Sequence, residues 1–196
     1  MFNFYSTAGL IFGNETSLNS CSQIIDTLGK NIFVVSDRGL TELGLIEPTI
    51  KKLKKNCNIK IFNDVESDPS KKTLLNAFSD AREFESTGVL GFGGGSSMDV
   101  AKLVSLLLGS NQQIETIWGV NNAKGPRLPL VLIPTTAGTG SEVTPISIIT
   151  MDDKEKKAVS SKFILPDLAI LDPLLTTNLP ANITASTGID AMVHAI

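Results

Sequence analysis

The chain has 196 residues and a formal net charge of −3, and it is 42% hydrophobic and 19% charged. This composition is ordinary for a packed protein, and the length suits one domain or one domain with a small second one. Residues 51–55 hold four lysines around Leu53, which we interpret as a solvated helix face, so no nucleic-acid partner is expected. No apolar run reaches the roughly 18 residues that a membrane span needs, so no membrane association is expected.

The cysteines indicate a reducing compartment. Cys21 and Cys57 have no metal-binding spacing and form no disulfide framework. Residues 1–5 lack the basic flank of a secretory signal peptide. These features predict a cytoplasmic protein with two reduced thiols.

Apolar, strand-like runs alternate with helical periods along most of the chain. This alternation predicts an α/β fold, with a mostly parallel sheet and flanking helices. In chain order, the expected elements are a helix at 17–28, a strand at 31–36, a helix at 47–55, a strand at 59–62, a helix at 70–85, a strand at 87–91, a helix at 97–108 and a strand at 128–133.

After Pro145 the pattern changes to shorter segments. Three short strands are expected, at 146–150, 158–160 and 168–171. Residues 181–196 have the pattern of a helix that ends on apolar residues without a cap. We therefore expect residues 1–180 to form the α/β domain and 181–196 to begin a second, helical domain that is absent from this chain.

Glycines follow one of the expected buried strands, in the segment 91–97. The three consecutive glycines 93–95 carry no Cβ, so a ligand can approach the backbone closely. Ser96, Ser97 and Asp99 can cap the next helix, whose N-terminal amides favour an anion. A phosphate or diphosphate suits such a loop, and the alternative is a tight strand-to-helix turn without a ligand.

Hydroxyl groups follow another expected strand. Residues 133–145 contain four threonines, one serine and two glycines. Open α/β sheets bind their ligands at the carboxyl ends of the strands. The two polar loops together suggest one phosphate-containing ligand held between them.

Asp37 follows the expected strand at 31–36, and the glycine loop begins 54 positions later (91 − 37). The usual dinucleotide fingerprint has the opposite order, with glycines first and the acid about 20 residues later. Asp37 is a candidate acceptor for a ribose 2′-hydroxyl that repels a 2′-phosphate. The alternative is a turn or cap residue.

Asp190 and His194 are at positions i and i+4 of the last expected helix and share one face. A carboxylate and an imidazole so placed can chelate a divalent metal. The alternative is a side-chain hydrogen bond between them. His194 is the only histidine of the chain, and a catalytic site typically has three protein ligands.

Three segments, 93–102, 133–145 and 188–196, together resemble the iron-containing (group III) alcohol dehydrogenases, in the same order along the chain. The resemblance implies a dehydroquinate synthase-like nucleotide-binding domain that binds NAD(P), followed by a helical domain that supplies much of a metal site. It also implies hydride transfer between an alcohol and an aldehyde or ketone, in which a metal makes the alcohol proton easier to lose and the cofactor carries the redox change.

The resemblance assigns roles to individual residues. Asp37 would select NAD over NADP. The diphosphate would be held by Gly94, Gly95 and Ser96. The cofactor would be lined by Thr135, Thr136, Thr139 and Thr144, with Lys157 nearby. Asp190 and His194 match the first two metal ligands, with Fe²⁺ expected and Zn²⁺ as the alternative. Asp68 stands where many relatives have Asn near the adenosine.

The chain departs from the family pattern because the family adds two more histidines, and His194 is the only one here. We therefore expect a fragment of an NAD-dependent dehydrogenase, inactive in isolation, that acts on a small alcohol or aldehyde and forms a homo-oligomer when complete. One alternative is a stand-alone, non-catalytic nucleotide-binding module. Another is a fragment of a zinc enzyme like glycerol dehydrogenase.

Overall fold

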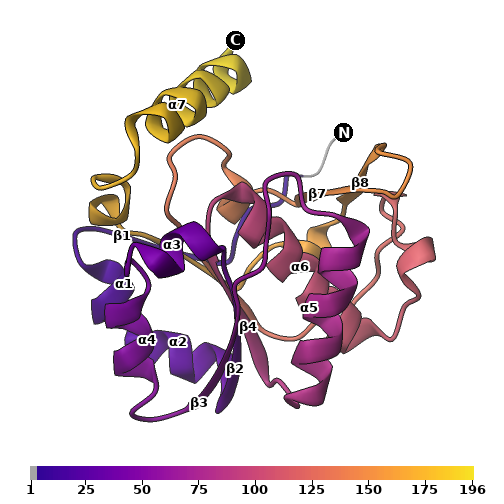
Figure 1. The fold of residues 1–196 in the computed structure, drawn as a ribbon. Helices are drawn as coiled ribbons and strands as arrows, with labels where there is room; N and C mark the ends of the chain where they lie inside the picture. The colour runs from indigo at the N-terminus through magenta and orange to yellow at the C-terminus, as the bar shows by residue number, and fades with distance from the viewer. Residues whose placement is uncertain (1–3) are drawn as a thin grey trace.

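The computed structural model describes residues 4–196 and is built around one parallel sheet (Figure 1). Its six strands lie in the order β1-β9-β6-β4-β2-β3, and all neighbouring pairs are parallel. The strands are β1 (Gly9–Phe12), β2 (Asn31–Val35), β3 (Asn58–Phe62), β4 (Gly88–Gly93), β6 (Leu130–Pro134) and β9 (Leu168–Leu171). β4 and β6 are buried along their whole length, as expected for central strands covered on both faces. The predicted α/β fold class is confirmed.

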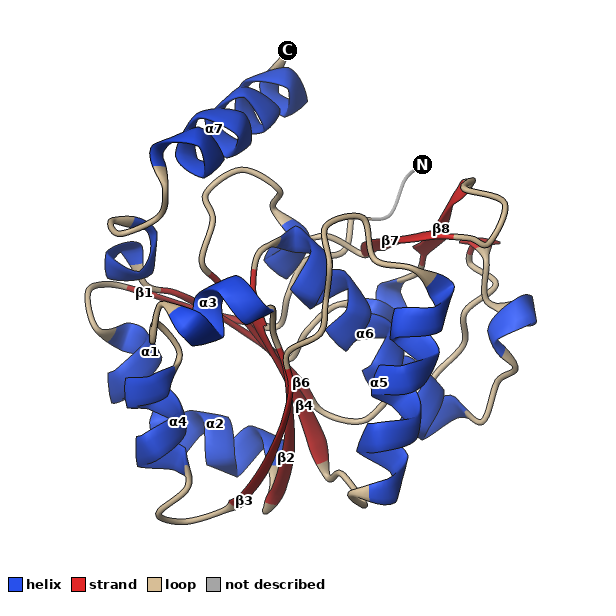
Figure 2. Ribbon diagram, viewed as in Figure 1, coloured by secondary structure: helices blue, strands red, loops and turns tan. Residues whose placement is uncertain are grey.

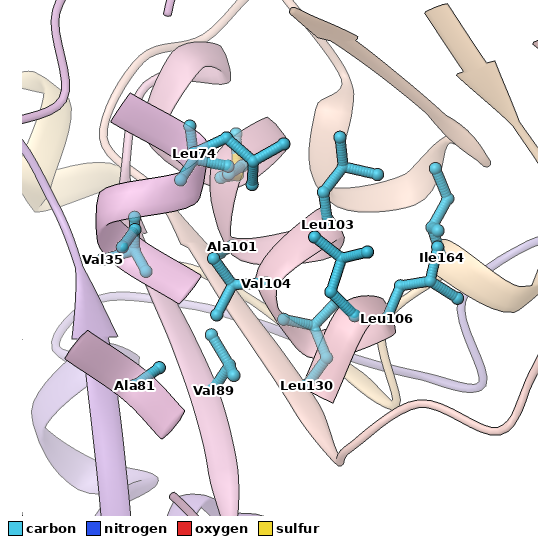
Figure 3. Close-up of a cluster of buried hydrophobic side chains, with 14 of the residues drawn as sticks. Val35, Leu74, Ala81, Val89, Ala101, Leu103, Val104, Leu106, Leu130 and Ile164 are labelled. Atoms are coloured by element: carbon cyan, nitrogen blue, oxygen red, sulfur yellow. The ribbon is translucent and has the colours of Figure 1, made fainter. Parts of the chain in front are cut away.

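Helices cover both faces of this sheet (Figure 2). One layer contains α1 (Thr16–Asn19), α2 (Cys21–Leu28) and α4 (Glu47–Leu53), and the other contains α5 (Lys71–Glu83) and α6 (Gly95–Ser110). Each layer has its own hydrophobic core. Figure 3 shows the second one, where Val104 and Leu106 of α6 lie close to Val89 and Leu130 of the sheet. These side chains are fully buried, which fixes α6 on the sheet.

A small second sheet packs beside α6, with strand order β5-β8-β7. It contains β5 (Gly119–Val120), β7 (Ile146–Thr150) and β8 (Lys156–Ser160). The remaining helical turns are α3 (Arg38–Glu42), η1 (Ile114–Thr116), η2 (Ser141–Val143), η3 (Lys162–Ile164) and η4 (Pro173–Thr176). The last helix, α7 (Ala181–Ala195), has no buried residue and extends away from the sheet in Figure 1. In the part of the chain that the structure describes, no helix combines the length and apolar character of a membrane span.

Some elements differ from the sequence predictions. The helix expected at 17–28 is interrupted at Ser20, so α1 and α2 are separate. β1 and α3 were not expected. β1 has only four residues, which alternate between half-buried and exposed because the strand lies at the sheet edge, so it lacks the apolar run that marked the other strands.

An ion pair joins the loop before β6 to the loop before β9. Arg127 donates to both carboxylate oxygens of Asp167, at 2.7 and 2.9 Å, and the Leu130 N–H donates to Asp167 at 2.8 Å. Burial disfavours the charged form of Asp167, but these hydrogen bonds outweigh it and lower the pKa of that carboxyl. The pair therefore stabilises two neighbouring parallel strands.

This ion pair predicts an acid-dependent loss of stability. Because the pKa of Asp167 is lower in the folded chain, its contribution is present above the unfolded-state pKa of about 3.9 and is lost as pH falls through the folded-state pKa. We expect the stability difference between wild type and Asp167→Asn to be largest near neutral pH and to shrink in acid. Urea unfolding at several pH values measures this difference, and a difference that stays constant into acid would contradict the assignment.

Candidate functional site

A cleft of about 700 Å³ opens at the carboxyl ends of β2, β4 and β6. Its lining residues are Asp37, Arg38, Gly39, Leu40, Leu43, Asp64, Val65, Glu66, Ser67, Gly94, Gly95, Ser96, Ser97, Thr135, Thr136, Thr139, Leu179, Pro180, Ile183 and Thr187. After β2 the chain continues outward to β3, and after β4 it continues in the opposite direction to β6. The cleft therefore lies where the strand order reverses, which is the usual ligand position in open α/β sheets.

The glycine loop forms the turn from β4 into α6. Gly94 occupies the N-cap position of α6, and no side chain in the described part of the chain caps this end of the helix. The prediction that Ser96, Ser97 or Asp99 caps α6 is therefore wrong, and Asp99 instead accepts hydrogen bonds from the Ser141 hydroxyl and from the Ile148 N–H in β7. The uncapped first-turn amides and the helix dipole make this end suited to an anion.

Two threonine hydroxyls at the cleft have no hydrogen-bond partner within residues 4–196. The Oγ1 atoms of Thr135 and Thr136 are buried and unpaired among the described residues, as is Oγ of Ser36, which follows β2. A buried polar atom without a partner costs free energy, so such atoms are uncommon in folded proteins unless a ligand or water satisfies them. Thr135 and Thr136 both line the cleft beside the glycine turn.

Asp37 lies at the N-terminus of α3, at one end of the cleft. Its Oδ1 accepts a hydrogen bond from the Leu40 N–H at 3.0 Å, so Asp37 caps this short helix. Oδ2 has no partner among residues 4–196, and the side chain lines the cleft. The cap role that the sequence left as an alternative is confirmed, and Oδ2 is still available to a ligand.

Two of the predicted cofactor contacts, Thr144 and Lys157, do not line the cleft. Thr144 precedes β7 and its carbonyl oxygen accepts a hydrogen bond from Lys102 at 3.1 Å. Lys157 lies in β8, in the smaller sheet. Their contact with a cofactor remains a prediction.

A buried lysine that the sequence analysis did not identify holds the threonine loop against α6. The side chain of Lys102 is fully buried, and its Nζ donates to Ser141 Oγ at 2.8 Å and to the Ile146 carbonyl at 2.7 Å. Asp99 accepts from the same Ser141 hydroxyl at 2.7 Å. The sequence around Lys102 does not predict this role. Lysine is almost never fully buried unless it is paired, and the partners of Lys102 are distant in the sequence.

Asp190 and His194 approach one another on α7, with 3.7 Å between Asp190 Oδ1 and His194 Nε2. Both side chains are well exposed. Within residues 4–196, no group of three or more His, Cys, Asp or Glu side chains is arranged to hold a metal ion. The two residues offer an oxygen and a nitrogen donor on one helix face, which is fewer than a catalytic metal site typically needs.

Comparison with known proteins identifies the family of the α/β part of the chain. Residues 8–173 match the family model for iron-containing alcohol dehydrogenase. The sulfoacetaldehyde reductase of Bilophila wadsworthia is 35% identical over 198 residues, covering 100% of this chain and 51% of that protein. A crystal structure of 1,3-propanediol oxidoreductase has a TM-score of 0.93 at 30% identity, covering 100% of this chain and 52% of the other.

A further structure, of sulfoacetaldehyde reductase from Bifidobacterium kashiwanohense in complex with NAD⁺, has a TM-score of 0.84 at 28% identity. The match covers 97% of this chain and 51% of that one. The chain thus spans about half the length of these relatives. The family model, by contrast, covers most of the chain and includes the glycine turn, the threonine loop and Asp37. The chain therefore belongs to the iron-containing alcohol dehydrogenase family.

Proposed function

We propose that the cleft binds NAD and that the chain is the nucleotide-binding part of an oxidoreductase that interconverts an alcohol and an aldehyde or ketone. The observation that carries the proposal is the pair of buried, unpaired hydroxyls of Thr135 and Thr136 beside the uncapped start of α6. A dinucleotide has phosphate and ribose oxygens that would satisfy both groups. The NAD⁺ in the Bifidobacterium relative supports the same assignment.

Each side of the cleft has a role in this proposal. The backbone amides at Gly94, Gly95 and Ser96 would hold the diphosphate, because a helix N-terminus favours negative charge and the glycines allow close approach. The hydroxyls of Thr135, Thr136 and Thr139 would bind along the same cofactor, with Asp37 accepting from the adenosine ribose. When bound, NAD supplies the hydride acceptor or donor of the reaction.

We also propose that Asp190 and His194 supply two donors to a divalent metal, with iron or zinc as the candidates. These two donors do not complete a catalytic site by themselves, because such a site typically has three protein ligands. A small alcohol or carbonyl compound is the proposed substrate.

The exposed apolar side chains of Leu10 and Phe12 on edge strand β1 support a homo-oligomer. The free thiols of the two cysteines support a cytoplasmic location.

The direct test is isothermal titration calorimetry of the chain with NAD⁺ and NADP⁺. We expect NAD⁺ to bind with 1:1 stoichiometry and more tightly than NADP⁺. The absence of binding with either coenzyme would contradict the proposed function.

Asp37→Asn tests the basis of that preference. Asparagine keeps an oxygen that can accept from the Leu40 N–H, so the α3 cap is retained while the charge is lost. The ratio of the NADP⁺ and NAD⁺ dissociation constants should fall by about tenfold, which corresponds to roughly 1.4 kcal/mol of removed repulsion. An unchanged ratio would show that Asp37 serves only as a helix cap.

A further inference from the structure

The charged side chains that line the cleft are mostly acidic, although the proposed ligand is an anion. Three carboxylates line it, from Asp37, Asp64 and Glu66, against one cationic side chain, Arg38, among the described lining residues. Burial disfavours the charged form of Glu66, but hydrogen bonds from Ser70 and Thr73 outweigh this and lower its pKa. The side-chain charges therefore do not attract a phosphate, and Arg38 carries the only guanidinium among the described lining residues.

That guanidinium is already occupied. Arg38 Nε donates to Asp64 Oδ1 at 2.7 Å, and Nη2 lies 2.6 Å from the same oxygen. Arg38 is the first residue of α3, and Asp64 follows β3 by two positions, so the pair connects the ends of two neighbouring strands. Arg38 follows Asp37 directly in the sequence, and Asp37 is the residue proposed to accept a hydrogen bond from the adenosine ribose.

The pair is exposed, with 72% of the Arg38 side chain and 54% of the Asp64 side chain accessible. An exposed ion pair contributes little to folding stability, so its loss should not disturb the fold. A phosphate monoester carries more charge than a carboxylate and presents three acceptor oxygens, which makes it a strong partner for a guanidinium. Arg38 would therefore be a good ligand for a ribose 2′-phosphate if it were free.

We propose that Asp64 sets coenzyme selectivity by holding the guanidinium of Arg38 and withholding it from the 2′-phosphate of NADP. In this arrangement Asp37 repels the 2′-phosphate, and Asp64 removes the one side chain that would compensate for that repulsion. The selectivity is then a property of three linked charges and not of Asp37 alone. This inference rests on the proposed function, because it concerns the same cofactor cleft.

The test is a double-mutant cycle measured by calorimetry on the whole chain, with NAD⁺ and NADP⁺ as the probes. The variants are Asp64→Asn, Arg38→Gln and the two combined. Asp64→Asn should lower the ratio of the NADP⁺ and NAD⁺ dissociation constants by about three- to tenfold, while NAD⁺ affinity stays near the wild-type value. The same change in the Arg38→Gln background should leave the ratio unchanged, because there is no guanidinium to release.

A matched control separates a local effect from a change in net charge. Glu115, whose side chain is 63% accessible, pairs with the partly buried Lys71 at 3.0 Å and does not line the cleft. Glu115→Gln removes the same charge and should leave the ratio unchanged.

The outcomes distinguish this inference from the proposed function. If wild type binds NAD⁺ but Asp64→Asn lowers the ratio equally with and without Arg38, Asp64 acts only through its charge and the inference is wrong. An unchanged ratio in Asp64→Asn would also overturn it, whereas wild-type protein that binds neither coenzyme would overturn the proposed function itself.

Discussion

Lys102→Met is expected to lower the free energy of unfolding by about 3–5 kcal/mol, the cost of removing one partner from a buried ion pair. The Lys102 side chain is fully buried, and its Nζ lies 3.7 Å from Asp99 Oδ1. The same Nζ donates hydrogen bonds to Ser141, Thr144 and Ile146. Methionine fills a similar volume but leaves these acceptors unsatisfied and Asp99 without a counter-ion.

Urea unfolding of a double-mutant cycle measures this effect. The double variant, Lys102→Met with Asp99→Asn, should lose less unfolding free energy than the sum of the two single variants. The reason is that Asp99→Asn removes the carboxylate that Lys102→Met leaves without a counter-ion. Lys156→Met is the matched control, since Lys156 pairs with Asp68 at 2.7 Å on the exposed surface and should cost less than about 1 kcal/mol. Equal costs for Lys102→Met and Lys156→Met would contradict the account of the buried network.

The same lysine predicts a pH dependence of stability. Burial lowers the pKa of Lys102 from 10.5 to about 8, although Asp99 and Glu142 oppose this shift. Between these two pKa values the unfolded chain binds more protons than the folded chain, so stability should rise as pH increases from about 8 towards 10.5. This rise should be absent from Lys102→Met, and a rise that persists in the variant would assign the dependence to other groups.

Gly94→Val is expected to weaken NAD⁺ binding on the order of 100-fold while leaving the fold intact. Gly94 has φ −75° and ψ −174°, which a β-branched residue adopts without strain. A Cβ at this position would meet only Thr136, at 3.6 Å, which is an ordinary van der Waals distance. Because both residues line the cleft, the added side chain would occupy the space proposed for the diphosphate.

At Gly88, in contrast to Gly94, a substitution is expected to lower the stability of the fold and not the affinity for NAD⁺. A Cβ on Gly88, at the start of β4, would lie 2.6 Å from the carbonyl oxygen of Leu28. Gly88→Ala should therefore destabilise the fold by about 1–3 kcal/mol while leaving the NAD⁺ affinity of the folded protein unchanged. Thermal unfolding and calorimetry on both variants should separate the two effects. If Gly94→Val bound NAD⁺ as wild type does, the diphosphate could not lie against this turn.

The sheet was predictable because its strands carry strong local signals. β2, β4 and β6 are short apolar runs buried on both faces, and their alternation with helical periods indicates parallel connections. β1 has no such run, and its position depends on pairing with β9, in which Gly9 lies opposite Leu168, 159 residues later in the chain (168 − 9). Local sequence patterns do not reveal a pairing of this range.

The candidate site was predictable to a similar degree. Strand ends in a parallel sheet converge, so residues that follow β2, β4 and β6 had to lie near one another, and Asp37, Gly94 and Thr135 do. Side-chain partners were not predictable. Asp99 was expected to cap α6, yet it binds the loop that carries Ser141, and Lys102 is buried by that same loop. Both roles depend on the path of residues 135–146, which no local period specifies.

The central claim is that a pyridine dinucleotide lies across the carboxyl edge of this sheet with its diphosphate at the glycine turn. A crystal structure of the chain grown with NAD⁺ tests it most directly. We predict that diphosphate oxygens contact the backbone amides of Gly95 and Ser96, that the Thr135 and Thr136 hydroxyls gain partners, and that a ribose lies at Asp37. Nucleotide density elsewhere on the molecule, with both hydroxyls still unpaired, would contradict the account.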